Sequence, residues 1–92
     1  MVEINTPFVG VSCVLSAGTK PISFEWLKNG QSLNDNNDPS VTIRNEDMYS
    51  VLELKALTVN DVGNYTCIAT NSQGSDQFTA VLLMRGEYHL LR

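Results

Sequence analysis

The folds open to this chain are limited by four residues at fixed separations, namely Cys13, Trp26, Tyr65 and Cys67. In a two-sheet β-sandwich, cysteines placed mid-strand on facing sheets can form a disulfide, and an indole from a neighbouring strand fills the space beside it. A tyrosine two residues before the second cysteine donates its hydroxyl to backbone just upstream and fixes the loop that enters its strand. One sandwich core needs all four residues at once, so their joint spacing predicts this architecture.

Apolar residues alternate with polar ones along most of the chain, and turn residues separate the alternating runs. This pattern is typical of an all-β sandwich, and no segment has the periodicity of a helix. Asn29-Gly30 predicts a tight turn because both residues tolerate positive φ, and the polar segment 34–39 predicts a surface loop. The inward positions expected are Val9, Val11, Cys13 and Leu15; Phe24 and Trp26; Val41 and Ile43; Ser50, Leu52, Leu54 and Leu57; Tyr65, Cys67 and Ala69; and Ala80, Leu82 and Met84.

The length of 92 residues suits one domain with a narrow margin of stability. We expect residues 1–85 to form this domain. Residues 86–92 have no turn signal or partner strand in the pattern, which predicts a linker or a frayed tail. If Cys13 and Cys67 pair, the closed loop removes about 4 kcal/mol of unfolded-state entropy, and oxidation indicates a secretory or extracellular compartment.

Charge and composition exclude several classes of function. The net charge is −4 and the six basic residues are scattered, which argues against nucleic acid or an acidic membrane as partner. No apolar stretch is long enough to span a membrane. The single histidine, His89, lies in the C-terminal segment and the cysteines serve the core, so we expect no catalytic residues and no enzyme activity. Segment 34–39 lacks the glycine and glutamate of a calcium loop, and we expect neither metal nor cofactor.

Two stretches give the chain a resemblance to intermediate-set (I-set) immunoglobulin domains over nearly its whole length: Trp26-Leu27-Lys28-Asn29-Gly30 and the run from Asp61 to Gly74. The run Gly63 to Gly74, with Ser50 to Leu54 before it, is most similar to extracellular domains of the Down syndrome cell adhesion molecule (Dscam) family of arthropods. The resemblance implies a Greek-key sandwich with a Cys13–Cys67 disulfide. It also implies a core signature of Trp26, Tyr65 and Asp61.

The chain departs from this family at two places. Only twelve residues precede Cys13, which leaves little room for the first strands. Ser40 stands where many members carry an arginine that pairs with the aspartate matching Asp61, so that ion pair is not carried over.

Two outward faces are candidate interfaces. On one sheet, large apolar side chains face outward on adjacent strands, and a contiguous patch of this kind is rare on a soluble monomer. These residues are Leu27, Ile68, Val81 and Leu83. The alternative is that they are scattered singly, or that the loop following strand segment 22–28 (C′) or the C-terminal tail covers them. On the opposite sheet, the outward residues carry mixed charge and suit a two-fold contact in which Glu53 of one copy meets Arg44 or Lys55 of the other. They are Thr42, Arg44, Val51, Glu53 and Lys55. Residue character favours the first face, whereas the resemblance implies homophilic pairing through the second.

The sequence Asn64-Tyr65-Thr66 is an acceptor for N-linked glycan, and the inward Tyr65 turns Asn64 outward. The alternative is that Asn64 carries no glycan and that the motif is present only because the tyrosine corner needs Tyr65.

Together these features predict an extracellular adhesion module of a multidomain cell-surface or secreted protein, whose partner is a second copy of itself. A receptor domain without self-association is a second possibility. An intracellular structural I-set domain of the muscle-filament type, with reduced cysteines, is a third.

Overall fold

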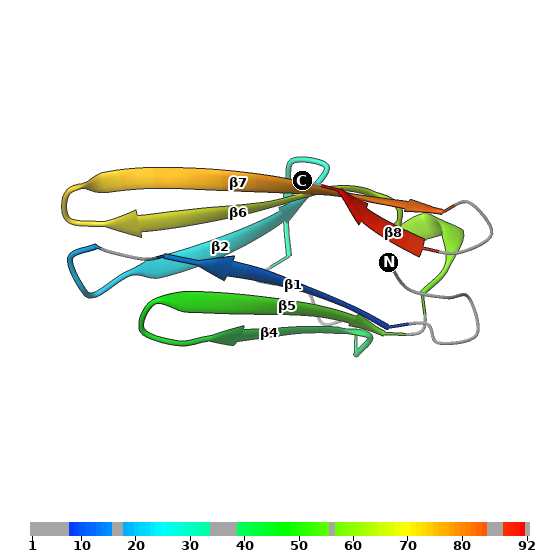
Figure 1. Cartoon of the computed structure of the whole chain (residues 1–92), viewed down its shortest axis with the longest axis horizontal. Helices are drawn as coiled ribbons and strands as arrows, with labels where there is room; N and C mark the ends of the chain where they lie inside the picture. Colours follow the sequence, from blue (N-terminus) through cyan, green and yellow to red (C-terminus); the bar gives the residue numbers. More distant parts are fainter. Residues whose placement is uncertain (1–7, 16–17, 34–38, 56, 85–87, 92) are drawn as a thin grey trace.

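A computed structural model describes residues 8–15, 18–33, 39–55, 57–84 and 88–91 of the chain. These residues form strands and one short 3₁₀ turn (Figure 1). The elements are β1 (Phe8–Val14), β2 (Ser23–Lys28), β3 (Gln31–Ser32), β4 (Val41–Asn45), β5 (Tyr49–Lys55), η1 (Val59–Asp61), β6 (Gly63–Asn71), β7 (Gly74–Met84) and β8 (Tyr88–Leu91). Within these residues, no helix has the length and apolar character needed to cross a membrane.

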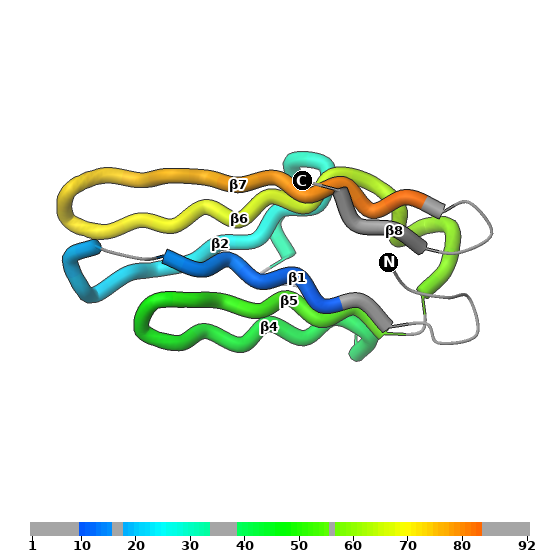
Figure 2. The backbone as a smooth tube through the Cα atoms, viewed as in Figure 1, coloured from blue at the N-terminus to red at the C-terminus, as the bar shows by residue number. Residues whose placement is uncertain are grey.

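The strands form two antiparallel sheets. One has three strands in the order β1-β5-β4, and the other has five in the order β3-β2-β6-β7-β8. Consecutive strands β1 and β2 therefore lie in different sheets, as a Greek-key sandwich requires. In Figures 1 and 2, β2, β6 and β7 run along one side of the molecule and β1, β5 and β4 along the other.

The core contains most of the inward positions that the alternation predicts, and three others, Leu15, Val41 and Ile43, are partly buried and pack against it. Residues with 9 % exposure or less include Val11, Cys13, Phe24, Trp26, Ser50, Leu52, Leu54, Leu57, Tyr65, Cys67, Ala69, Ala80 and Leu82. Cys13 of β1 and Cys67 of β6 form a disulfide between the sheets with a Cα–Cα distance of 6.4 Å. Burial of this apolar surface and the covalent link together hold the two sheets against each other. The side chains of Val9 and Met84 lie outside the described part of the chain, as do the loop residues 34–38.

The turn between β2 and β3 follows the chemistry of its two residues. Asn29 has φ of 50° and Gly30 has φ of 86°, the positive values of a tight hairpin turn. Asn29 also holds the start of β6: its backbone N–H donates to the Asn64 carbonyl at 2.8 Å, and its Oδ1 accepts from the Asn64 N–H at 2.9 Å. A Cβ at Gly63 would lie 2.8 Å from the Asn29 side chain, so only glycine fits beside this contact.

The expectation that the C-terminal segment lacks a partner strand is wrong for Tyr88–Leu91. These residues form β8 and pair antiparallel with the end of β7, with Val81 opposite Leu91 and Met84 opposite Tyr88. β6 pairs with one edge of β7, and the opposite edge of β7 is open for Tyr88–Leu91 to pair with. The segment carries no alternation or turn signal strong enough to predict this pairing from sequence.

Candidate functional site

The entry to β6 is fixed by the tyrosine corner that the sequence predicts. The Tyr65 hydroxyl donates to the backbone carbonyl of Asp61. The Asp61 carboxylate accepts from the Thr58 N–H at 2.7 Å, and the Thr58 hydroxyl accepts from the Asn60 N–H at 3.2 Å, which together cap η1. Burial raises the pKa of the Tyr65 phenol well above its usual range, and the nearby Asp61 carboxylate adds to this rise. Asp61 therefore orders the local backbone, and among the described residues it has no ion-pair partner.

A buried polar chain links Trp26 to the opposite sheet. The Trp26 indole N–H donates to the Ser50 hydroxyl at 2.8 Å, and this hydroxyl donates to the Asn45 side-chain oxygen at 2.6 Å. Ser50 is fully buried, so this bond satisfies a polar group that would otherwise destabilise the core. The sequence predicts that Ser50 points inward, but it does not reveal that Ser50 is the acceptor for Trp26.

The structure divides the four apolar residues predicted on the five-stranded sheet into two groups. Leu27 on β2, Thr66 on β6 and Thr79 on β7 form one row across the sheet. Leu27 is the apolar member of this row, and the two threonines are polar. The hydroxyls of Thr66 and Thr79 lie 3.0 Å apart. Val81 and Leu83 lie on one side of this row.

Ile68 lies on the other side of the row, between Glu25 and Gln77. Leu27, Ile68, Val81 and Leu83 are all half-buried. They do not form one continuous apolar patch.

The outer face of the three-stranded sheet is more continuous. Val14 is 62 % exposed and lies opposite Tyr49, which is two positions from Val51 on the same strand. Arg44 lies opposite Val51, and Glu53 lies between Gly10 and Thr42. We call the outward residues of this sheet the β1-β5-β4 face; they are Gly10, Ser12, Val14, Thr42, Arg44, Tyr49, Val51, Glu53 and Lys55. Apolar side chains and charges of both signs are thus brought together on this face.

Sequence reasoning missed the most exposed large apolar residues. Besides Val14, these are Val59 at 60 % exposure and Phe78 at 36 %. Val14 follows Cys13 directly, so period two places it outward, and this signal could have identified it. Phe78 lies opposite the buried Cys67, on the inner side of β7, and its exposure could not be read from alternation.

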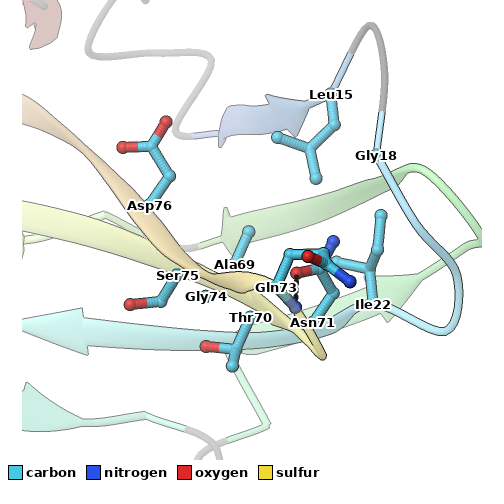
Figure 3. A pocket seen from close by; sticks show the side chains of 10 residues that line it. All are labelled: Leu15, Gly18, Ile22, Ala69, Thr70, Asn71, Gln73, Gly74, Ser75 and Asp76. Atoms are coloured by element: carbon cyan, nitrogen blue, oxygen red, sulfur yellow. Dashed lines mark hydrogen bonds between the residues drawn. The ribbon is translucent and has the colours of Figure 1, made fainter.

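A cleft of about 270 Å³ opens at one end of the sandwich (Figure 3). Leu15 faces Ile22, Ala69 and Asp76 across it, and Asp76 is the one charged side chain among its described lining residues. The Asn71 side chain donates to the Thr19 carbonyl at 3.0 Å and ties the loop before β2 to the turn before β7. The cleft contains none of the candidate site residues. It brings together no nucleophile and base, and among the described residues no cluster of metal-binding side chains is present.

Asn64 is exposed on the outer face of the five-stranded sheet, as the inward position of Tyr65 predicts. It lies opposite Val81, at the end of β6 that carries the tyrosine corner.

The comparisons with known proteins agree on one family. The immunoglobulin I-set domain model matches residues 10–84. The human cell adhesion molecule DSCAML1 is 33 % identical over 75 residues, and human DSCAM is 35 % identical over 77 residues, covering 82 % and 84 % of this chain. The chain spans 4 % of the length of each relative.

Solved structures show the same fold. The Dscam1 Ig7 domain, isoform 5, superposes with a TM-score of 0.73 at 31 % identity, covering 80 % of this chain and 75 % of that one. The M1 domain from titin gives a TM-score of 0.77 at 26 % identity, covering 89 % and 82 %.

Proposed function

Because the chain belongs to the immunoglobulin I-set family, we propose that it is an extracellular recognition module of a cell-adhesion protein and that it pairs with a second copy of itself. The similarity to two cell adhesion molecules supports the adhesion role. The Cys13–Cys67 disulfide supports an oxidising, extracellular compartment. Within this proposal, the domain needs neither metal nor cofactor.

The β1-β5-β4 face is the surface that we assign to self-recognition. The observation that carries this assignment is the continuous group of Val14, Tyr49 and Val51 beside charges of both signs. The small residues Gly10 and Ser12 on β1 allow a partner to approach this sheet closely. A few desolvated apolar anchors supply most of the free energy of such a contact, and charge matching sets its specificity.

A two-fold contact makes this face complementary to itself. In an isologous interface each residue pair occurs twice, so Arg44 of one copy meets Glu53 of the other, and the reverse. Val51 lies between these positions, opposite Arg44 and two residues from Glu53 on β5. The sequence pattern favours the five-stranded face, but the Thr66–Thr79 row separates Ile68 from Val81 and Leu83 there, which is why we prefer this alternative.

Sedimentation of the domain over a wide concentration range tests the proposal. We expect a reversible dimer that Val14→Asp abolishes, because the aspartate places an unpaired charge in the contact. Val14 is exposed in the monomer, so this variant should lose at most about 1 kcal/mol of folding stability. Leu83→Asp on the five-stranded sheet is the control and should leave the dimer intact, with thermal melting to confirm that it is folded.

A charge exchange sharpens the assignment. Arg44→Glu and Glu53→Arg should each weaken self-association, because each variant repels its own copy across the two-fold axis. An equimolar mixture of the two variants should recover a dimer, since in the mixed dimer both pairs join opposite charges: one is the original Arg44–Glu53 pair and the other has its charges exchanged. If only Leu83→Asp disrupts the dimer, the contact lies on the five-stranded sheet. If the domain stays monomeric at every concentration, the receptor function without self-association replaces this proposal.

A further inference from the structure

One exposed polar residue lies among the apolar side chains of the five-stranded sheet. We propose that Asn64 carries an N-linked glycan that covers Leu27, Val81 and Leu83 and leaves the β1-β5-β4 face as the bare recognition surface. This inference rests on the extracellular location in the proposed function, because the sugar is added in the secretory pathway.

The sheet register places Asn64 at the centre of these three residues. Val81 is its direct cross-strand neighbour on β7. Leu83 follows two positions later on the same face, and Leu27 pairs with Thr66, two positions from Asn64 on β6. Diagonal neighbours of this kind lie about 7–8 Å apart, within reach of the first sugars of a glycan. Ile68 is four residues away along the strand, about 13 Å at the usual rise, and lies outside this group.

The contacts of Asn64 leave its side chain available. Its backbone N–H and carbonyl are both bonded to Asn29, at 2.9 and 2.8 Å. Among the described residues, none forms a hydrogen bond with its side-chain amide, and the residue is exposed. The fold therefore fixes the backbone at this position without using the amide, which points away from the core.

The acceptor sequence supplies the remaining chemistry. Thr66 provides the hydroxyl that the sugar transferase requires two residues after the asparagine. The transfer forms a bond from Asn64 Nδ2 to the anomeric carbon of the sugar and breaks the bond from that carbon to the diphosphate of a lipid-linked oligosaccharide. The amide proton leaves with the lipid diphosphate. Because Tyr65 is buried in the folded domain, the step takes place on the chain before it folds.

A glycan in this position accounts for the large apolar side chains on an outward face. Sugar rings present C–H groups as well as hydroxyls, so they can cover Val81 and Leu83 while they remain hydrated on their outer side. Val81 and Leu83 are half-buried, and the part of each side chain that still meets solvent would be shielded by the sugar. The glycan therefore hinders association through the five-stranded sheet and favours pairing through the β1-β5-β4 face.

Occupancy is tested by secreting the 92-residue chain from insect cells and measuring its intact mass. We expect a mass above that of the polypeptide, which returns to the polypeptide value after enzymatic removal of N-linked glycan. Thr66→Ser should keep the glycan and Thr66→Ala should lose it. Thr79→Ala removes the hydroxyl contact between Thr66 and Thr79 but keeps the acceptor sequence, so this variant should stay glycosylated. A secreted wild-type chain with the bare polypeptide mass overturns the proposal.

Cover is tested by solvent paramagnetic relaxation of methyl groups, compared before and after glycan removal. We expect relaxation at Leu27, Val81 and Leu83 to be roughly halved in the glycosylated form, whereas Ile68 and Val14 stay unchanged. Equal relaxation of the methyl groups of these three residues in both forms overturns the covering role.

Sedimentation of the glycosylated chain separates this inference from the proposed function. A dimer that survives with the glycan present supports both. A chain that remains monomeric both with and without the glycan contradicts self-recognition, while the mass and relaxation results still stand. A dimer that appears only after glycan removal contradicts the assignment of the β1-β5-β4 face and supports the covering role.

Discussion

At the scale of single residues, Tyr65 connects the buried core to the loop that precedes β6. Its side chain is buried in the core, and its hydroxyl donates to the backbone carbonyl of Asp61, the residue whose carboxylate caps η1. A net hydrogen bond of this type contributes about 1 kcal/mol, and more when its loss leaves a buried acceptor unpaired. The corner thus fixes both the entry to β6 and the position of Asn64, one residue away.

Replacing Tyr65 with phenylalanine should lower the free energy of unfolding by about 1–2 kcal/mol at neutral pH, because the Asp61 carbonyl loses its donor. The pKa of Tyr65 is raised in the folded state, whereas the unfolded phenol titrates near its ordinary value of about 10. Above that pH the unfolded chain binds fewer protons than the folded one, so wild-type stability falls as pH rises.

The cost of Tyr65→Phe should therefore shrink in alkaline solution. Denaturant unfolding of both proteins at neutral pH and above about pH 10 measures this difference. Tyr49→Phe, at a half-buried position on the other sheet, is the control for loss of a phenol. A cost that stays constant across this range would contradict the role given to burial.

At the scale of elements, β8 is the part of the fold that the sequence did not predict. Removing residues 88–92 should expose the edge of β7 and lower stability by a few kcal/mol, since four residue pairs of the ladder are lost and each net backbone hydrogen bond contributes about 1 kcal/mol. Hydrogen exchange should speed up at Val81–Met84 and stay unchanged at Gly74–Ala80 of the same strand. Unchanged protection at Val81–Met84 would instead favour the linker that alternation predicts after residue 85.

Strands with a buried face could be predicted because period two records which side chains meet the core. This holds for β5, where Ser50, Leu52 and Leu54 are all buried. It fails for β8, whose pairing depends on an open edge of β7 and not on its own pattern. The candidate faces were predicted only as sets of outward residues. Whether such a set is continuous depends on cross-strand register, and the Thr66–Thr79 row that divides one of them needs the paired strands to be seen.

At the scale of the whole molecule, the redox state of Cys13 and Cys67 distinguishes an extracellular module from a structural domain of the cell interior. The two cysteines are 54 residues apart, and closing a loop of that length contributes about 4 kcal/mol in the chain-entropy account. A small domain has a total stability of about 5–15 kcal/mol, so the bond supplies a large share of it. The similarity to titin alone leaves open a domain that folds with both thiols reduced.

We expect reduction with dithiothreitol to lower the free energy of unfolding by about 4 kcal/mol in denaturant titrations. Alkylation without reductant should label neither cysteine of the native protein, because both sulfur atoms are bonded and buried. Alkylation after reduction and unfolding, which should label both, is the control for access. Two reactive thiols in the native domain, together with stability that reduction leaves unchanged, would contradict the extracellular assignment and support the muscle-filament type of domain. In that case the glycan at Asn64 would be excluded as well, since its transfer takes place only in the secretory pathway.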